Sequence, residues 1–264
     1  MAINALPSSS SELRALIRQG KWTGPTVALA PGRVQANLVV LPKEQAFDFL
    51  LFCQRNPKPC PLVEVLDPGN PEASQTAPRS DVRTDLPRYR IYRDGRMSAE
   101  VEDIREEWRP DLVTFLLGCS FSFEAALQHA GVPLRHVEEG KNVSMYITAI
   151  QTTPAGQFSG PMVVSMRPIP RDKVVRAVQV TSRFPSVHGA PVHIGNPQDI
   201  GIRDLSRPDF GDAVEVRDGE VPVFWACGVT PQALAVKSRP PLMITHAPGH
   251  MFITDLRDED LAVL

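Results

Sequence analysis

Short apolar runs, separated by prolines, glycines and polar turns, recur along the whole chain. The apolar positions within residues 13–17 lie at helical spacing, and Ser9 and Glu12 before them form the pattern of a capping box. This pattern predicts a helix that ends at Gly20. Similar spacing or a helix-start signal predicts further helices over residues 43–53, 111–117, 121–130, 170–183 and 230–237.

Other apolar runs are rich in β-branched residues and flank tight turns, which predicts strands. Mixed strands and helices, with hairpins beside strand–turn–helix units, predict an α/β (mixed α+β) fold whose mixed β-sheets are flanked by helices. We expect two subdomains, an α/β unit over residues 1–140 and a strand-rich α+β unit over 141–264, with interleaving of the two left open. The predicted strands lie at residues 34–41, 62–66, 89–92, 97–101, 143–151, 162–166, 214–216, 221–226, 242–245 and 251–254.

Composition narrows the class of protein. The chain has 264 residues, 28 Lys and Arg, 30 Asp and Glu, and a net charge of −2. This balance argues against a protein that mainly binds nucleic acid or an anionic membrane. Residues 1–20 lack the apolar core of a secretory leader, and no run is long enough for a membrane span. The four cysteines show no paired spacing, so we expect reduced thiols in a cytoplasmic protein.

The 26 prolines are spread along the chain, which favours ordered turns over a disordered linker. Residues 185–211 contain almost no predicted regular element. A connection of this length inside a domain is usually functional or disordered. Its glycines, histidines and apolar residues favour an ordered functional loop.

The first candidate site lies at residues 117–124, where the chain turns at a glycine and a helix begins. Ser120 or Ser122 would cap the helix, and free backbone N–H groups at a helix start bind anions. The helix dipole would also lower the pKa of Cys119 and favour a thiolate. The alternative is a buried small cysteine, with Glu124 only complementing the helix dipole.

A second strand–turn–helix junction contains Cys227, Gly228 and Thr230. Ligands often bind at such strand ends, although any α/β protein has several of these turns. Thr230 is predicted as the N-cap of the following helix. At the end of another apolar strand, Arg167 would hold a carboxylate with two hydrogen bonds. The alternative for Arg167 is a surface residue in a local ion pair.

Two pairs of histidines are candidate sites, the first for acid–base chemistry or a metal and the second for a metal only. His188 and His193 lie in a loop held by glycine and proline, and histidine titrates near neutral pH. His246 and His250 flank a Pro-Gly turn that opposes a helix. Neither pair has the neighbouring carboxylates or cysteines of a recognisable metal-ligand set, so we expect no metal. Dinucleotide-binding, P-loop and hydrolase-elbow motifs are also absent.

Seven segments occur in a fixed order over more than half of the chain. They are residues 118–124 (GCSFSFE), 142–146 (NVSMY), 160–168 (GPMVVSMRP), 188–195 (HGAPVHIG), 208–212 (PDFGD), 222–232 (PVFWACGVTPQ) and 245–251 (THAPGHM). Together they resemble the hydro-lyase family that is also called the D-glutamate cyclase family. The sequence departs from the family pattern at Ser144, Ile147 and Asn196, where the family commonly has proline, a basic residue and aspartate.

The resemblance implies a two-part α/β fold and a carbon–oxygen lyase (hydro-lyase) of amino acid metabolism. In the mitochondrial animal member it implies dehydration of D-glutamate to 5-oxo-D-proline. It implies no established catalytic residues, so the roles below come from residue chemistry alone.

We expect an enzyme that needs no cofactor and acts on a small amino or hydroxy acid, a carboxylic acid substrate. Glu124 or His188 would be the base and His193 the acid, with Cys119 an optional nucleophile. Alternatives are a hydratase or hydrolase of another small carboxylic acid, or a ligand-binding protein without catalysis. A homodimer is the default assembly. The expected substrate-binding residues are Arg167, Ser120, Tyr146, Cys227, Gly228, Thr230, His246 and Asp255.

Overall fold

The computed structural model describes residues 7, 9–27 and 29–263. Residues 1–6 and 8, which belong to the N-terminal stretch expected to lack the apolar core of a secretory leader, lie outside the described residues. Among the described helices, none is long and apolar enough to span a membrane. The helices are α1 (Ser10–Arg18), α2 (Lys43–Arg55), α3 (Glu124–His129), α4 (Arg135–Glu138), α5 (Val174–Ser182) and α6 (Thr230–Ser238). The strands are β1 (Arg33–Pro42), β2 (Leu62–Val65), β3 (Tyr89–Arg93), β4 (Arg96–Val101), β5 (Leu112–Gly118), β6 (Ser144–Gln151), β7 (Pro161–Pro170), β8 (His193–Ile194), β9 (Glu220–Ala226), β10 (Met243–His246) and β11 (Phe252–Arg257).

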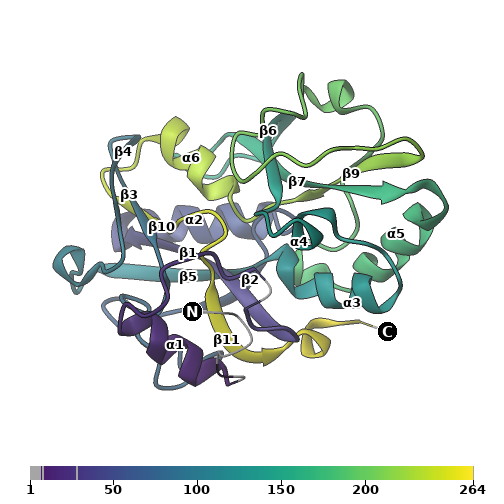
Figure 1. Ribbon diagram of the computed structural model, residues 1–264. Coiled ribbons are helices and arrows are strands. Elements are labelled where there is room, and N and C mark those ends of the chain that lie inside the picture. The colour runs from purple at the N-terminus through teal and green to yellow at the C-terminus, as the bar shows by residue number, and fades with distance from the viewer. Residues whose placement is uncertain (1–6, 8, 28, 264) are drawn as a thin grey trace.

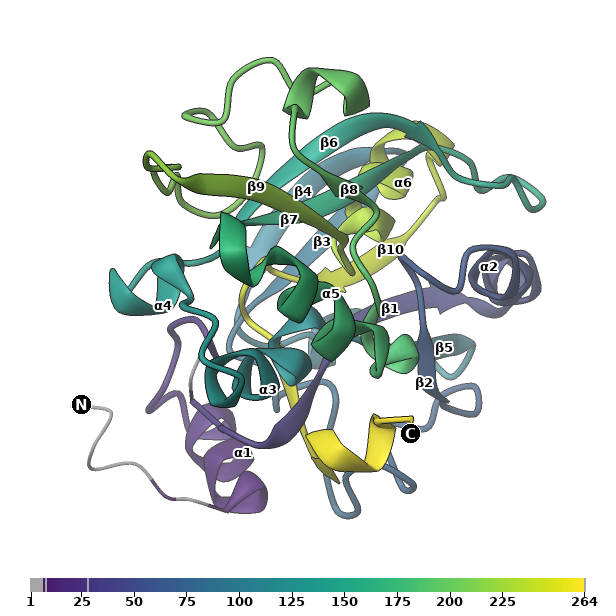
Figure 2. The same cartoon turned by 90° about the vertical axis from the view of Figure 1, so that its right-hand side faces the viewer.

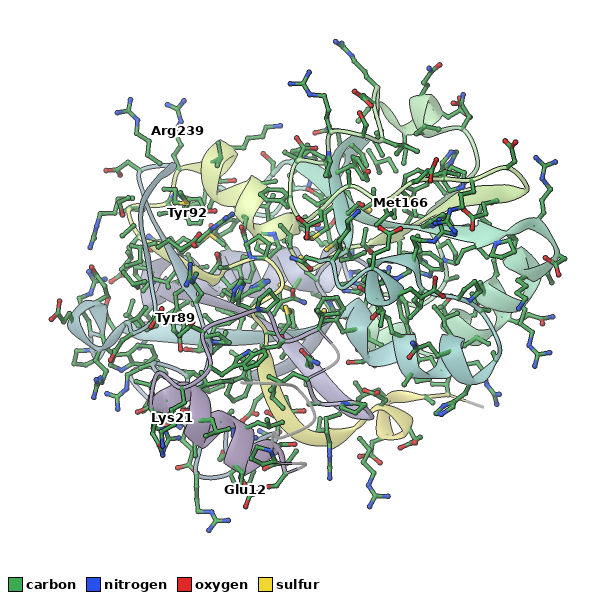
Figure 3. The ribbon with its side chains drawn as sticks, in the orientation of Figure 1. Glu12, Lys21, Tyr89, Tyr92, Met166 and Arg239 are labelled. Atoms are coloured by element: carbon green, nitrogen blue, oxygen red, sulfur yellow. The ribbon has the colours of Figure 1, made fainter. Side chains whose placement is uncertain are left out.

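The strands form two sheets that lie side by side (Figure 1). The large sheet has the order β2-β5-β1-β10-β3-β4, with β11 also paired to β1, and the small sheet has the order β6-β7-β9-β8. In Figure 3 the labelled Tyr89 and Tyr92 belong to the large sheet and Met166 belongs to the small one. The expected α/β class, with two sheets flanked by helices, is confirmed. Every pairing between described strands is antiparallel, whereas we expected mixed sheets.

The chain returns to its first sheet at the end. Strands β10 and β11 pair with β1, although β6 to β9 before them build the other sheet. Sheet membership therefore does not follow the order of the sequence. The subdomain boundary at residue 140 stays a prediction.

Both sheets are covered on their two faces. The large sheet has one apolar core beneath residues 66–86 and a second beneath α2. The small sheet packs against α3 and α5 on one face and against loop residues 192–216 on the other. Burial on both faces explains why β1 and β5 are apolar almost throughout.

The predicted helix over residues 111–117 is wrong, because this segment is strand β5. It pairs with β1 over seven successive positions, from Ala36 opposite Gly118 to Pro42 opposite Leu112. A continuous apolar run has no periodicity that separates a buried strand from a buried helix. The β-branched Val113 and Thr114 favour the strand.

Three predicted caps are also corrected. Ser9, Ser120 and Thr230 make no side-chain cap bond to their helices. Ser120 instead accepts a hydrogen bond from Arg167, and Thr230 begins α6 rather than preceding it. A hydroxyl near a helix start caps it only when no stronger partner competes.

Helix α6 connects the two sheets. It packs against β7 of the small sheet and against β10 and β4 of the large sheet (Figure 1). The turn that precedes α6 brings Gly228 against Asn37 of β1, and a side chain at Gly228 would overlap Asn37. Asn37 in turn donates to the carbonyl oxygens of Leu117 and Gly118 on β5. A glycine at residue 228 is thus what lets the helix approach the large sheet so closely.

Candidate active site

Strands β10 and β11 share one edge of β1 and leave a gap between them. Val39 pairs with Thr245 of β10, and Ala36 pairs with Phe252 of β11. In the gap, the backbone N–H of Leu38 donates to Nδ1 of His246 at 3.2 Å, so a histidine ring replaces the missing strand. The intervening residues 247–251 are free to leave the sheet and form one wall of a pocket.

This pocket has a volume of about 360 Å³ and brings distant segments together. Three of the segments that carry the family resemblance, residues 142–146, 208–212 and 245–251, supply most of its wall. Strands β3 and β4 supply the rest. The lining residues are Arg90, Glu100, Asn142, Asp209, Phe210, Gly211, Ala247, Pro248 and His250. We call this the central pocket.

A close backbone approach holds the two halves of the pocket together. Gly249 has φ +80°, and a Cβ there would overlap the side chain of Asn142. The Asn142 amide lies 3.4 Å from the carbonyl oxygen of Pro248 and donates to it. Only glycine adopts this conformation without strain, so the turn can close on Asn142 only with a glycine at residue 249.

Arg90 supplies a cation that is already oriented. Its Nε donates to Glu100 at 2.9 Å and its Nη1 donates to Gln232 at 3.2 Å. Gln232 is buried and donates to the carbonyl oxygen of His246. The hydrogen bond to Gln232 therefore fixes the position of Arg90 relative to α6 and β10. Arg90 Nη2 makes no hydrogen bond to a described residue, which leaves this nitrogen for a ligand.

His250 is poised as a neutral base. Its Nδ1 lies 3.0 Å from the carbonyl oxygen of Pro248. A carbonyl only accepts hydrogen bonds, so the ring proton is on Nδ1 and Nε2 carries a lone pair. Burial lowers the pKa of His250, and the positive charges of Arg88 and Arg90 lower it further. The ring is therefore neutral at pH 7.

Carboxylates lie on the opposite wall. Asp209 Oδ2 accepts from the backbone N–H of Ile147 at 2.8 Å, and Asp212 Oδ2 accepts from that of Asn142 at 2.8 Å. Each contact ties the 208–212 segment to the start of β6. Asp209 keeps its other oxygen for a ligand, since no described residue donates to it. The pocket thus presents both a cation and a carboxylate, which suits a zwitterion.

The sequence-predicted Glu124, Arg167 and Ser120 do converge, but away from this pocket. Arg167 is fully buried, not at the surface, and its Nε donates to Glu124 Oε1 at 3.1 Å. Its Nη1 donates to Ser165 and its Nη2 to Ser120 and Glu124. The guanidinium also lies between two aromatic rings, with its Cζ 5.3 Å from the centroid of Phe123 and 5.4 Å from that of Trp225.

Glu124 is ionised in this buried cluster. Burial raises its pKa, but His136 and Arg167 outweigh burial, and the pKa lies below its usual value. His136 Nε2 is 3.0 Å from Glu124 Oε1. Almost every donor of Arg167 already has a partner, so this arginine is bound to the protein's own carboxylate in this conformation.

The expected thiolate at Cys119 is wrong. The thiol is buried, and burial raises its pKa despite a hydrogen bond from the backbone of Phe121. Burial likewise raises the pKa of Cys227 to about 11. Both cysteines are reduced and uncharged at neutral pH.

Gly228 and Thr230 serve the junction of β9 and α6. Thr230 is fully buried, donates to the carbonyl oxygen of Cys227 at 2.7 Å and accepts from the backbone of Val163 at 3.1 Å. These bonds fasten the helix to both β9 and β7. The residues lie beside the core, not in the central pocket.

The two loop histidines lie apart in different surroundings. His188 is buried, with φ +82°, and its Nδ1 donates to the carbonyl oxygen of Lys58 at 2.7 Å. Burial lowers its pKa to about 4. His193 is half-buried on the edge strand β8, with Nε2 2.7 Å from the carbonyl oxygen of Asn196.

The remaining predicted ligands are also dispersed. Tyr146 faces the 192–216 loop, where its hydroxyl donates to Leu205 and burial raises its pKa to about 12. Asp255 forms an ion pair with Arg14 of α1 at 2.9 Å. His246 lies in the gap beside β1, and burial lowers its pKa to about 4. None of the expected catalytic or substrate-binding residues lines the central pocket, whereas His250, a metal candidate of the sequence, does.

Sequence reasoning missed the residues that do line this pocket. Arg90 lies in a hairpin that offers no signal, and Asp209 was quoted only within a longer segment. His250 was recognised only as a weak metal-ligand candidate. Within the described part of the chain, no group of three or more His, Cys, Asp or Glu side chains is arranged to hold a metal ion. The turn glycine of the His-Ala-Pro-Gly-His stretch was the available clue that this segment leaves its sheet.

Comparison with known proteins places these segments in a family. A family model described as D-glutamate cyclase matches residues 113–255. The chain belongs to the D-glutamate cyclase family. The match includes Asn142, Asp209 and His250 of the central pocket, whereas Arg90 and Glu100 precede it.

Several bacterial relatives match almost end to end. A "Putative hydro-lyase" of Stutzerimonas stutzeri is 66% identical over 97% of this chain and 97% of its own. "Putative hydro-lyase YcsI" of Bacillus subtilis is 64% identical over 96% of this chain and 98% of its own. The chain thus belongs, together with bacterial proteins that are named as hydro-lyases, to the family whose model is described as D-glutamate cyclase, and this relationship supports an enzyme of the hydro-lyase type.

Proposed function

We propose that the central pocket binds a small amino acid with a second carboxyl group and catalyses its cyclising dehydration, D-glutamate to 5-oxo-D-proline. The observation that carries this proposal is the meeting of three family segments around a pocket in which, among the described residues, one arginine nitrogen and one carboxylate oxygen have no partner and one imidazole is neutral. A volume of about 360 Å³ accommodates a molecule of this size.

The chemistry assigns one role to each polar group. Arg90 Nη2 binds the α-carboxylate of the substrate and Asp209 orients its ammonium group. His250 Nε2 takes a proton from the ammonium, and the freed amine attacks the side-chain carboxyl carbon. A bond forms between nitrogen and carbon, and the second amine proton is lost as the bond to the departing oxygen breaks. Both protons leave with that oxygen as water, so no cofactor or redox partner is consumed.

The residues expected from the sequence offer a competing assignment. Glu124 or His188 as base, His193 as acid and Cys119 as nucleophile stay predictions from residue chemistry. Their positions outside the pocket favour structural roles for the first two, since an acid and a base must reach the same substrate. The same enzyme assay separates the two assignments.

The decisive assay follows turnover by proton NMR with D-glutamate, L-glutamate and a panel of small hydroxy acids. We expect turnover with one glutamate enantiomer, and a loss of roughly 10²- to 10⁴-fold in His250→Gln. Arg90→Gln should raise KM because it removes a carboxylate contact. Asp111→Asn, at an exposed ion pair remote from the pocket, is the matched control and should keep full activity.

Two results would overturn this assignment. If His250→Gln kept wild-type turnover while a folded Glu124→Gln lost it, the buried cluster would be the active site. Binding of the acids without any turnover would instead indicate a ligand-binding protein.

A further inference from the structure

A large cavity of the described structure shares no lining residue with the central pocket. It has a volume of about 700 Å³ and lies where α3, α5, the start of β1 and the C-terminal 3₁₀ turn, Asp258–Leu261, come together (Figure 2). None of the family segments lines it. We call it the α3–α5 cleft. Its apolar wall consists mainly of Pro31, Ala125, Ala126, Val180, Phe184 and Ala262.

Asp258 and Glu259 both line this cleft, and Asp258 is the buried carboxyl group of the two. Asp258 is only 6% exposed, and its Oδ1 has no hydrogen-bond partner among the described residues. It makes no ion pair with a described residue either, although its backbone N–H donates to Gly32. A buried carboxyl oxygen without a partner is costly, and native proteins keep one where it has a use.

The charged groups nearest to Asp258 are engaged with other partners. A smaller cavity of about 70 Å³ continues from the cleft and is lined by Asp258, Glu124 and Arg33. Glu124 is already paired with Arg167 on its far side, and Arg33 donates to the backbone carbonyl of Asp255 at 2.7 Å. At the cleft itself, Arg183 donates from Nε to the carbonyl oxygen of Val263 at 3.3 Å.

We propose that the α3–α5 cleft is a second ligand site, which binds a small organic primary ammonium whose apolar body lies along α3 and α5 and whose N–H groups donate to Asp258. The apolar wall supplies hydrophobic contact, and the unpaired oxygen at its end supplies the directional bond. The amide of Gln128, which also lines both cavities, is a second acceptor for the same ammonium. This site is independent of turnover at the central pocket.

The titration of Asp258 makes the binding depend on pH. Burial, and then the charge of Glu259, raise the pKa of Asp258 to about 7, against the opposing effects of Ser122 and Arg33. The other titratable groups around it are Glu124 and His129 of α3 and Arg183 of α5. At pH 6 most of the carboxyl is protonated and cannot pair with an ammonium. Affinity should therefore be roughly tenfold higher at pH 8 than at pH 6.

The test measures the binding of benzylammonium by calorimetry and by changes in amide NMR shifts. Benzyl alcohol and benzoate, which have a similar shape but are neutral and anionic, are the control ligands. We expect benzylammonium to bind at least roughly tenfold more tightly than benzyl alcohol, because a hydrogen bond to a charged group is lost in the alcohol. Amide shifts should move at Gly32, Ala126 and Val180. Asp258→Asn should remove the preference, whereas Asp111→Asn, at an exposed ion pair that does not line the cleft, should keep it.

A second variant covers the case in which Asp258→Asn does not fold. Ala126→Leu fills the cleft from the α3 side and should weaken benzylammonium binding while Asp258 stays intact. The proposal is overturned if benzyl alcohol binds as tightly as the ammonium, if neither variant changes the affinity, or if the shifts map to the central pocket.

Discussion

At the scale of single residues, the burial and pairing of charged side chains were the features least predictable from the sequence. Glu124 was recognisable as a carboxylate in a first helical turn, and Arg167 as an arginine at a strand end. Their pairing across 43 positions, and the burial of both, depend on how β7 packs against α3. Local sequence therefore indicated two polar residues of interest, but not that they neutralise each other inside the core.

The first prediction at this scale concerns that ion pair. Glu124→Gln leaves the Arg167 cation buried without its partner, so the free energy of unfolding should fall by about 3–5 kcal/mol. Replacing both residues, as Glu124→Leu with Arg167→Met, removes the stranded charge and should restore much of this loss. Urea unfolding measures both changes. The exposed pair of Arg109 and Asp111 is the control, and Asp111→Asn should cost less than about 1 kcal/mol. Equal losses in Glu124→Gln and Asp111→Asn would contradict a structural role for the pair.

At the scale of elements, periodicity predicted amphipathic helices well and buried strands poorly. Helices α1 and α2 have one apolar face and were recognisable, whereas β5 is apolar on both faces and was mistaken for a helix. The contact of α6 with β1 could not be predicted at all. It depends on Gly228 meeting Asn37, residues far apart in the sequence that only the packed structure brings together.

The second prediction tests this contact. Gly228→Ala should lower the free energy of unfolding by about 1–3 kcal/mol, because the new methyl group overlaps Asn37 and forces it from the carbonyl oxygens of β5. Gly24→Ala is the matched control, since a Cβ there would meet only ordinary contacts, 3.7 Å from Trp22. Adding Asn37→Ala to Gly228→Ala should cost less than the sum of the two single changes. Additive losses would show that the two residues do not press on each other.

At the scale of the whole molecule, the candidate site exists because the C-terminal part of the chain returns to the first sheet. Segments 142–146, 208–212 and 245–251 were identified from the sequence, but nothing in it placed them around one pocket with Arg90 of β3. They meet because β10 and β11 rejoin the first sheet beside β1. The fold class was predictable from local patterns, whereas this long-range pairing was not.

The third prediction concerns the acid stability of the assembled molecule. Burial lowers the pKa of His188 and of His246 from 6.5 to about 4, so both are neutral in the folded state. Between pH 6.5 and pH 4 the unfolded chain binds protons that the folded chain does not, and stability falls as the pH falls. Each histidine contributes about 3 kcal/mol across this window. Asp258 acts in the opposite sense, because its pKa of about 7 lets the folded state bind a proton first.

Because the histidines and Asp258 change the stability in opposite directions, the effect of one histidine is best measured by comparing variants. His188→Asn removes one titrating group and suits the backbone, since asparagine tolerates the φ of +82° at this position. The free energy of unfolding, measured with urea, should then fall less steeply between pH 7 and pH 5 than in the unchanged protein. The slope of this free energy against pH should correspond to the uptake of about one proton fewer on unfolding. His129→Asn, at an exposed position on α3, is the control and should keep the original slope. An unchanged slope in His188→Asn would mean that His188 accepts a proton in the folded state, and so that it is available for the acid–base chemistry first expected of it.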